Sequence, residues 1–443
     1  SLETTVAILN EASRMAEMEL NPLQSIGDQQ PAYLENGIVR TAPGFSEGYK
    51  AIADGGWIGV AANSKYGGMG LPLTIQNCVN EMLNSSCLSL ALNPLMTQGQ
   101  IEALEHHASE EIKTLYLPKL ITGEWSGTMN LTEPQAGSDV GALTTKAIKN
   151  DDNTYSISGQ KIYISWGDND FTNNVCHLVL ARLPDGVQGT KGISLFLVPK
   201  FLPHHDGTVG KKNNLNVVSL EHKVGLHGSP TAVMEYDKAT GWLIGKEHQG
   251  MKAMFTMMNN ARLGVGAEGL GTAEAAFQKA LTFAMGRKQG KTLTNDTGTI
   301  IDHADVRRML MIMKSKTYAS RAICLATAVA IDMSNASKEE FWINRAALLT
   351  PIAKSFGTET GIEVSNLGIQ IHGGMGFVEE TGAAQYWRDV RVTSIYEGTN
   401  GIQAIDLVSR KLMDGEESAI HLITEIQELI TSDCSNITKF KQK

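Results

Sequence analysis

One acidic residue near the C-terminal end has the neighbours expected of a general base. Glu397 lies between Tyr396 and residues 398–401, which read Gly-Thr-Asn-Gly. A carboxylate with so few polar side chains to solvate it has a raised pKa and can take up a proton near neutral pH. A second glycine-rich turn stands upstream at residues 370–377. The pattern predicts proton abstraction by Glu397, so other motifs must bind a substrate and an electron acceptor.

Two segments upstream suit a flat, phosphorylated cofactor. Residues 129–139 read Met-Asn-Leu-Thr-Glu-Pro-Gln-Ala-Gly-Ser-Asp, so that a hydroxyl precedes a proline-fixed turn and a Gly-Ser pair offers donors to a phosphate. Further on, Tyr163 and Ser165 occupy alternating sites of an expected strand, which would form a platform for a flat ring. Either segment alone is equally compatible with an ordinary β-turn. Together with Glu397 they favour a cofactor site.

Composition narrows the class of protein. The 443 residues are 42% hydrophobic and 19% charged, a globular balance with room for two or three domains. A net charge of −9 argues against a nucleic-acid surface, and no apolar run is long enough to span a membrane. The five cysteines are scattered, without a CxxC pair, so we expect a reducing compartment, no metal site and no disulfide framework. The chain begins at Ser1 without a signal-like segment, and we therefore expect a processed N-terminus.

Hydrophobic periodicity divides the chain into three domains. Residues 1–123 have mostly helical spacing, residues 124–242 contain short apolar runs of strand length, and residues 243–443 return to long helical stripes. Gly159 is expected to turn the chain between strands at 154–158 and 161–165. No crossover helix separates the strands, so the sheet should be largely antiparallel and barrel-like. The predicted fold class is α+β, with an antiparallel β domain between an N-terminal helical domain and a C-terminal helical bundle.

Two motifs look functional but are better explained by packing or solvation. Residues 264–269 match GxGxxG, yet a helical segment precedes them and no acid stands near position 289, so the glycines should allow close helix approach. The adjacent His106 and His107 would point about 100° apart on a helix and cannot both face one metal ion. We expect a solvated face there.

Taken together, these motifs resemble those of the acyl-CoA dehydrogenase family over nearly the whole chain. In that family an N-terminal helical domain, a middle β domain and a C-terminal four-helix domain hold FAD and an acyl-CoA thioester. The resemblance implies that Thr132 binds the flavin pyrimidine, Ser138 the pyrophosphate and Ser165 flavin N5. The FAD residues implied within one subunit are Met129, Leu131, Thr132, Gly137, Ser138, Tyr163, Ser165 and Thr399. Those implied to reach the FAD of a neighbouring subunit are Arg287, Gln289, Gln370, Ile371 and Gly374. The implied substrate contacts are Ser138, Asn259, Arg262 and Tyr396, with no metal ligand.

The resemblance also implies a reaction. Glu397 would remove the proton α to the thioester carbonyl while a hydride leaves the β carbon for flavin N5. Electron-transfer flavoprotein would accept the electrons from a homodimer or homotetramer. The compartment would be the cytoplasm of a bacterium, or the mitochondrial matrix in a eukaryote. Trp166 stands where the family usually carries Asn, Gly290 where Phe is common, and Gly401 where an acidic or amide residue is common.

The chain also resembles the large branch that includes 3-methylmercaptopropionyl-CoA dehydrogenase, whose members usually continue into an extra C-terminal helical domain. The segments that carry this resemblance lie at residues 21–28, 44–50, 55–57, 66–72, 191–200, 219–223 and 379–384. The substrate would be 3-methylmercaptopropionyl-CoA, as in DMSP demethylation, or a short or medium fatty acyl-CoA, as in β-oxidation. Two alternatives stay open. An acyl-CoA oxidase would use the same base and pass electrons to oxygen, and a non-catalytic flavoprotein scaffold would not be reduced by any thioester.

Overall fold

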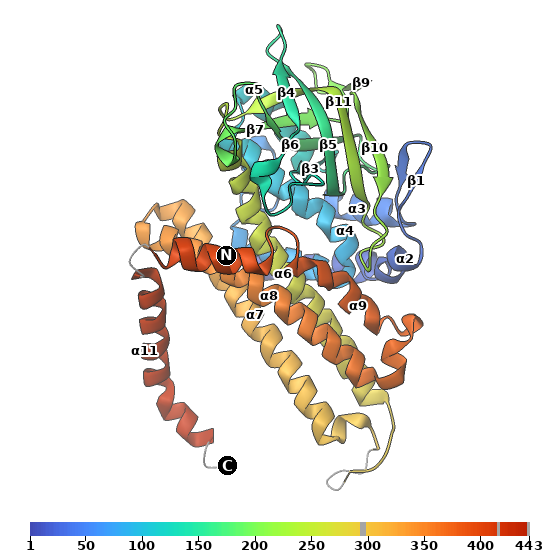
Figure 1. Cartoon of the computed structure of the whole chain (residues 1–443). Helices are drawn as coiled ribbons and strands as arrows, with labels where there is room; N and C mark the ends of the chain where they lie inside the picture. Colours follow the sequence, from blue (N-terminus) through green and yellow to red (C-terminus); the bar gives the residue numbers. More distant parts are fainter. Residues whose placement is uncertain (293–297, 414–416, 441–443) are drawn as a thin grey trace.

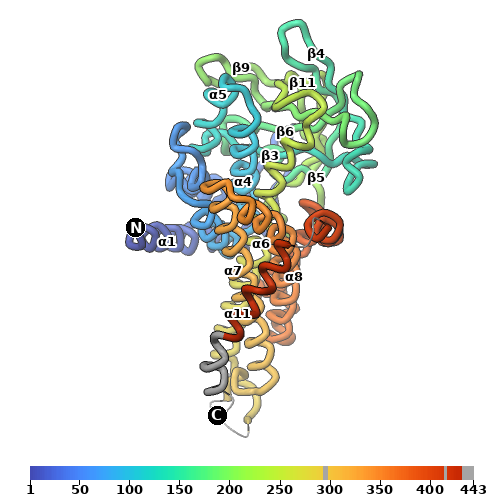
Figure 2. The backbone as a smooth tube through the Cα atoms, turned by 90° about the vertical axis from the view of Figure 1, so that its left-hand side faces the viewer, coloured from blue at the N-terminus to red at the C-terminus, as the bar shows by residue number. Residues whose placement is uncertain are grey.

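The computed structural model describes residues 1–292, 298–413 and 417–440, with side chains up to residue 431. A β-rich part and a long bundle of helices lie at opposite ends of the molecule, with further helices between them (Figure 1). The view turned by 90° shows the bundle as an elongated extension away from the strands (Figure 2). The predicted order of helical, β and helical parts is therefore confirmed.

The N-terminal part is mainly helical, as expected. Its helices are α1 (Leu2–Met15), α2 (Leu23–Gln29), α3 (Phe45–Asp54), α4 (Leu73–His107) and α5 (Glu110–Ile121). The sequence did not predict the small antiparallel hairpin formed by β1 (Tyr33–Glu35) and β2 (Ile38–Arg40). The long helix α4 is broken at Cys87, whose backbone adopts φ −154° and ψ 86°. A side chain from the β domain binds close to this break.

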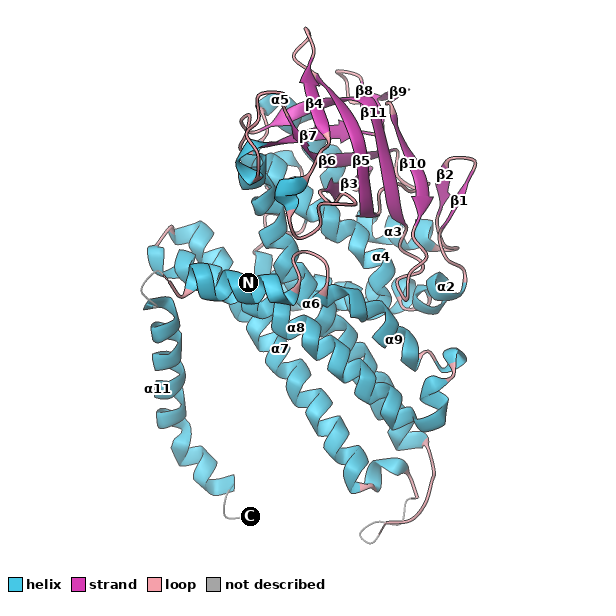
Figure 3. Ribbon diagram, in the orientation of Figure 1, coloured by secondary structure: helices cyan, strands magenta, loops and turns pink. Residues whose placement is uncertain are grey.

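The middle part forms a sheet that nearly closes on itself (Figure 3). Its strands are β3 (Trp125–Asn130), β4 (Lys146–Lys149), β5 (Tyr155–Ser165), β6 (Asn174–Arg182), β7 (Ile193–Pro199), β10 (Leu215–Leu220) and β11 (Thr231–Ile244). A separate hairpin joins β8 (Phe201–Pro203) and β9 (Val209–Lys212). Pairings run from β11 through β5, β4, β6 and β7 back to β11, which makes a barrel-like ring. Most pairs are antiparallel, as predicted, whereas β3 and β4 pair with β6 in parallel.

The prediction of a turn at Gly159 is wrong. Residues 155–165 form one strand, and the glycine lies inside it with φ +151°, where an added Cβ would lie 2.5 Å from Thr145 Oγ1. The glycine therefore admits a close neighbouring strand rather than a turn. The regular alternation expected after it is also interrupted, because the register with β11 shifts between Ala232 and Met234. At this irregularity Tyr163 has φ +60° and a 61% exposed side chain, while Ile164 is buried.

The C-terminal part is built on three long helices that pack closely. They are α6 (Gly250–Gly286), α7 (Ala304–Ser337) and α8 (Glu340–His372), followed by α9 (Ala383–Val390), α10 (Asn400–Asp406) and α11 (Glu417–Phe440). The GxGxxG stretch lies within α6, so the packing explanation of its glycines is confirmed. An added Cβ would lie 2.2 Å from Gly357 O at Gly269, and 2.8 Å from Ala353 O at Gly266. These glycines let the α6 and α8 backbones touch.

This contact gives a prediction about stability. We expect Gly269→Ala to lower the free energy of unfolding by about 2 kcal/mol, because a new methyl group would press on backbone that cannot rotate away. Gly286→Ala in the same helix is the matched control, since nothing lies within 4 Å of its added Cβ. The control should be neutral or slightly stabilising. Urea unfolding followed by circular dichroism compares the two, and equal stabilities would contradict the close helix contact.

The largest apolar core does not respect the three parts of the sequence. It joins Leu88 and Leu95 of α4 to Trp125 and Leu178 of the sheet and to Met254 of α6. Trp166, which follows β5, lies in this core with 1% exposure. Its indole N–H donates a 3.1 Å hydrogen bond to Ser89 O, two residues past the break in α4.

Two aromatic rings lie near Trp166, that of Phe45 in α3 and that of Phe171 in the loop after β5. The ring centroid of Trp166 lies 6.3 Å from that of Phe45 and 5.6 Å from that of Phe171. Burial of so large a side chain ties the β domain to α3 and α4. No helix within residues 1–292, 298–413 and 417–440 has the length and apolar character needed to cross a membrane.

Candidate active site

Glu397 lies on a short loop between α9 and α10 whose backbone is held in an unusual conformation. Its φ is +54°, a left-handed value that is uncommon for a residue with a side chain, and Gly398 follows with φ +80°. Three hydrogen bonds at the start of α10 fix the loop. Gln403 Nε2 donates to Glu397 O at 3.3 Å and to Gly398 O at 3.1 Å, and Thr399 Oγ1 caps α10 by accepting from Ile402 N. A strained backbone held by such contacts is typical of functional positions.

The charge on Glu397 is set by burial and by two cations. Burial raises the pKa of its carboxyl to about 7, while the charges of Arg262 and Lys354 pull it in the other direction. Its side chain is only partly exposed, and Arg262 and Lys354 are both buried. A carboxyl with a pKa near neutrality can take up and release protons at physiological pH. The prediction that burial tunes Glu397 therefore agrees with its surroundings.

The sequence did not reveal the buried polar cluster beneath this loop. Glu268 of α6 is fully buried and accepts a hydrogen bond from the Tyr396 hydroxyl. Lys354 of α8 is also fully buried and donates to Asn400 Oδ1 at 2.9 Å. The signal was present, since Glu268 is the one charged residue between Arg262 and Glu274. A single charged residue in an apolar stretch, however, could equally well have faced solvent.

The two segments expected to bind a flavin are joined in the structure. Ile162 N in β5 donates to Thr132 O at 2.9 Å, and Lys161 Nζ donates to Leu131 O at 3.0 Å. Thr128 Oγ1 in β3 donates to Ser165 O at 2.7 Å. These contacts bring the hydroxyls of Thr132 and Ser165 into one region, although the bulge turns the exposed Tyr163 ring out of strict alternation.

This region has the donors that FAD requires. In the part of the chain that the structure describes, the hydroxyls of Thr132 and Ser165 form no hydrogen bond with protein, so both remain available to a ligand. Gly137 and Ser138 are exposed, and an added Cβ at Gly137 would meet nothing within 4 Å. Hydroxyl and backbone donors of this kind suit a flavin ring and a pyrophosphate. Met129, by contrast, is almost fully buried in β3.

A buried ion pair between Lys161 and Glu133 stabilises the segment that is expected to bind the flavin. The sequence analysis did not predict this ion pair. Lys161 Nζ lies 2.8 Å from Glu133 Oε1, and both side chains are buried. Glu133 also accepts hydrogen bonds from the backbone and hydroxyl groups of Thr144 and Thr145. Burial alone would raise the pKa of Glu133, but Lys161 and these donors bring it down to about 2. The pair therefore stays charged and holds residues 131–133 against β5.

The other expected FAD residues lie together at the far end of the bundle. Arg287 follows the last turn of α6, and Gln370 and Ile371 lie in the last turn of α8. Stacking of Phe283 on His372, with centroids 4.3 Å apart, shows that the two helix ends meet. Arg287, Gln289, Gln370 and Gly374 are exposed, whereas the Ile371 side chain is buried in the bundle core.

This second group is remote from the first. Arg262 and Arg287 are separated by 25 residues of α6, or about 38 Å at the rise of an α-helix. Leu131 and Tyr396 both pack on the core of the first region, while Ile371 belongs to a separate core in the lower bundle. The structure thus brings the expected FAD residues into two groups rather than one.

The expected substrate residues have different surroundings. Arg262 is buried and its guanidinium lies 3.4 Å from Asp406 Oδ2. The Tyr396 hydroxyl is occupied by Glu268, so its ring rather than its hydroxyl is available to a ligand. Asn259 is exposed on the first half of α6.

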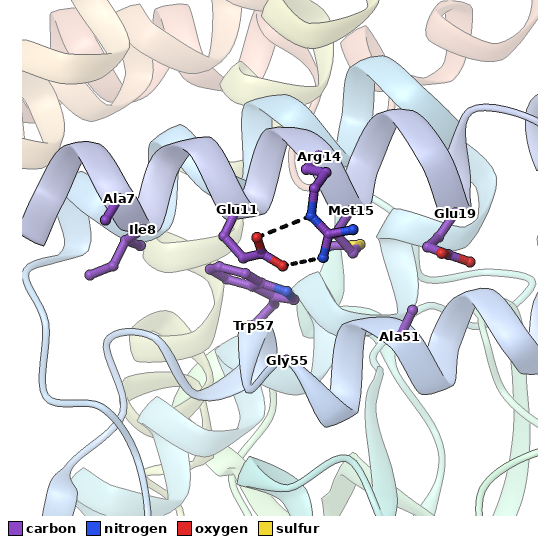
Figure 4. A pocket seen from close by; sticks show the side chains of 9 residues that line it. All are labelled: Ala7, Ile8, Glu11, Arg14, Met15, Glu19, Ala51, Gly55 and Trp57. Carbon is purple, nitrogen blue, oxygen red and sulfur yellow. Dashed lines mark hydrogen bonds and ion pairs between the residues drawn. The ribbon is translucent and has the colours of Figure 1, made fainter.

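Two cavities are lined by other residues, and the second of them reaches Phe283 and His372 beside the remote group. One of about 510 Å³ lies between α1 and the end of α3, where Glu11 and Arg14 pair above Trp57 (Figure 4). Another of about 720 Å³ is lined by Glu81, Glu274 and other residues between α4 and α6. Neither contains a residue that the sequence assigned to a site.

Histidines and cysteines were expected to have no metal role. His106 is exposed, while His107 is partly buried with Nε2 2.7 Å from Thr256 Oγ1, so only part of the expected solvated face is seen. Among the described residues, no group of three or more His, Cys, Asp or Glu side chains could hold a metal ion. The side chain of Cys434 lies outside the described residues.

Comparison with known proteins agrees with the geometry. Three family models match in succession: the N-terminal domain of acyl-CoA dehydrogenase at residues 3–124, the middle domain at 128–239 and the C-terminal domain at 248–413. The chain is 47% identical to 3-methylmercaptopropionyl-CoA dehydrogenase of Ruegeria pomeroyi, over 94% of this chain and 72% of that protein. It is 37% identical to a butyryl-CoA dehydrogenase of Syntrophomonas wolfei, over 84% of this chain and 64% of that protein.

Solved structures lead to the same family. The fold superimposes on butyryl-CoA dehydrogenase from Megasphaera elsdenii with a TM-score of 0.77 and 26% identity, covering 92% of this chain and 98% of that one. The family models together account for most of the sequence, and the nearer relatives are named dehydrogenases of acyl-CoA thioesters. The chain belongs to the acyl-CoA dehydrogenase family, whose members are FAD-dependent enzymes.

Proposed function

We propose that the chain removes two hydrogens from the α and β carbons of an acyl-CoA thioester, with Glu397 as the base. The observation that supports this most directly is the partly buried carboxyl of Glu397, on a left-handed backbone, with a pKa of about 7. A weakly acidic α proton needs a base whose pKa lies near the working pH. FAD bound by the region around Thr132 and Ser165 would supply the acceptor for the hydride from the β carbon.

The residues around Glu397 suit the proton transfer. Arg262 and Lys354 favour the carboxylate form, so the base is ready to accept a proton while burial keeps it reactive. The backbone N–H of Glu397 donates to no acceptor in the described chain, and it is therefore available to the thioester oxygen as negative charge develops there. Tyr396 packs against the apolar core, so a substrate bound beside its ring would have water excluded from its reacting carbons.

The relatives narrow the substrate class. We propose a short thioester, either 3-methylmercaptopropionyl-CoA or a short- or medium-chain fatty acyl-CoA, because the names of similar proteins include 3-methylmercaptopropionyl-CoA and butyryl-CoA dehydrogenases. We also propose that the three domains meet at residues 123 and 242. The electrons would pass from the reduced flavin to an electron-transfer flavoprotein.

Anaerobic titration of the FAD-loaded protein with a panel of acyl-CoAs tests the function. We expect 3-methylmercaptopropionyl-CoA or butyryl-CoA to bleach the oxidised flavin band, and the initial rates to rank the acyl chains. Reoxidation of the reduced protein by air then separates the two classes of enzyme, since rapid reaction with oxygen would indicate an oxidase. Bound FAD that no thioester in the panel reduces would contradict the proposal.

We further infer that the remote group at the end of the bundle completes the FAD site of a neighbouring subunit. Its exposed polar side chains and its distance from Thr132 support this arrangement. Mixed oligomers test it, because Glu397→Gln disables a subunit's own base whereas Arg287→Ala damages the site of its neighbour. Each variant alone should be nearly inactive. Co-expressed with separate affinity tags, the mixed species should recover roughly half of the wild-type activity per dimer through one intact site, and no recovery would contradict a shared site.

A further inference from the structure

The cluster beneath the Glu397 loop connects three helices to the base. Glu268 comes from α6, Lys354 from α8, and Tyr396 and Asn400 from the loop and the first turn of α10. Asn400 is itself held from two sides. It accepts from Lys354 Nζ at 2.9 Å, and its Nδ2 donates to Glu359 Oε1 at 2.7 Å. Movement of any of these side chains would therefore be transmitted to the loop that carries Glu397.

Glu268 is a member of this cluster whose burial is only partly compensated by hydrogen bonds. Its side chain is fully buried, and the helix positions one turn away from it are Gly264, Val265, Gly271 and Thr272. One carboxyl oxygen, Oε2, accepts from the Tyr396 hydroxyl, while Oε1 has no hydrogen-bond partner within the described residues. A buried carboxyl without full compensation destabilises a protein, so its presence next to a reactive group needs an explanation.

We propose that Glu268 is a positioning residue for Glu397, acting through its hydrogen bond with Tyr396. The hydrogen bond to Tyr396 fixes the residue immediately before Glu397, and so maintains the left-handed backbone that directs the base. Lys354 is the cation common to both acids. This inference rests on the proposed role of Glu397 as the base, and it assigns a function to a residue that does not itself meet the substrate.

The charges around the two acids give the proposal a signature in pH. Facing Glu268 are Tyr396, Glu397 and Lys354, and facing Glu397 are Arg262 and Lys354. Beyond these, Asp406 and Arg410 act on Arg262, and Glu359 acts on Lys354. Burial raises the pKa of Glu268 to about 8, above the value of about 7 for Glu397.

The two carboxyls are electrostatically coupled, so their protons are released by the pair rather than by one residue and then the other. An ionised carboxylate at position 268 places a negative charge near Glu397 and increases the proton affinity of that base. The pH dependence of flavin reduction should therefore depend on a carboxyl at position 268.

Four variants test the proposal with two independent readouts. Glu268→Gln keeps an acceptor for Tyr396 but removes the charge, and Glu268→Ala and Tyr396→Phe each remove the hydrogen bond. Glu81→Gln is the matched control, because Glu81 is another shielded carboxyl of the bundle, paired with Arg321 and away from the loop. Hydrogen exchange of the peptide covering residues 393–403, measured by mass spectrometry, reports the position of the loop without requiring turnover. The rate constant of flavin reduction by acyl-CoA against pH reports the coupling.

The expected results differ among the variants. Exchange of the loop should be at least fivefold faster in Glu268→Ala and Tyr396→Phe, with no further increase when both changes are combined. In Glu268→Gln and Glu81→Gln it should stay within twofold of wild type. The pH at which flavin reduction reaches half of its maximal rate should fall in Glu268→Gln, because a negative charge near Glu397 is removed, and should stay unchanged in Glu81→Gln.

Two results would overturn the positioning role. The first is loop exchange in Glu268→Ala within twofold of wild type, and the second is a pH profile of Glu268→Gln that matches the wild-type profile. If no thioester reduces the wild-type flavin, the proposed function of Glu397 is wrong. Even then, the exchange data still decide whether Glu268 holds the loop.

Discussion

Replacing Glu397 with Gln is expected to slow flavin reduction by acyl-CoA by about 10²- to 10⁴-fold, the usual contribution of a positioned general base. The amide has nearly the same size and can accept the same contacts, but it cannot take up the α proton. FAD should remain bound, because Glu397 is not among the residues expected to hold it. Stopped-flow absorbance under anaerobic conditions measures the rate constant, and the flavin spectrum measures cofactor content.

Two controls define what this loss would mean. Glu380→Gln removes an exposed carboxylate from the turn before α9 and should leave the reduction rate within twofold of wild type. Glu397→Asp keeps the charge but shortens the side chain by one methylene, so it should be slower than wild type and faster than the Gln variant. Rapid bleaching of the Gln variant would assign the base to another residue.

The second large effect is expected at the buried ion pair of the middle domain. Lys161→Met should lower the free energy of unfolding by about 4 kcal/mol, because it leaves the Glu133 carboxylate buried without its cation. It also removes the donor to Leu131 O, so the segment that carries Thr132 should become less ordered. Urea unfolding measures the first consequence, and the FAD content of the purified protein measures the second.

The reference for this prediction is an exposed pair. Lys119 lies 2.7 Å from Glu124 Oε2 with both side chains about one-third exposed, so Lys119→Met should cost less than about 1 kcal/mol. Combining Lys161→Met with Glu133→Gln should restore much of the lost stability by removing the unpaired charge. Equal losses for Lys161→Met and Lys119→Met would show that water reaches the pair.

The sequence predicted most of the fold because periodicity and glycine placement are local properties. The helical spacing of residues 250–286 and the lack of a strand before the GxGxxG stretch were enough to assign those glycines to helix packing. Glu397 could also be chosen from the sequence as a candidate base, since its neighbours are small or aromatic and supply little solvation. In each case the physical cause lies within a few residues of the feature.

Features that depend on contacts between distant segments could not be predicted. The bulge that exposes Tyr163 arises from the register of β5 against β11, some 70 residues further along the chain. The ion pair of Lys161 with Glu133 and the contact of Glu268 with Tyr396 likewise join separate elements. A single charged residue in an apolar stretch can face solvent or be buried, and only the packed partner decides between these outcomes.

The core around Trp166 bears on how this protein can vary. Residues 3–124, 128–239 and 248–413 match three separate family models, yet one continuous apolar interior contains side chains from all three segments. A chimera that takes its middle segment from a distant relative would bring a foreign set of side chains to meet Leu88, Leu95 and Met254. Each segment can thus be recognised as a separate domain of the family, but it cannot be exchanged for the same domain of a distant relative without changes in the shared core. Substitutions on one side of the shared interior would have to be accompanied by compensating substitutions on the other.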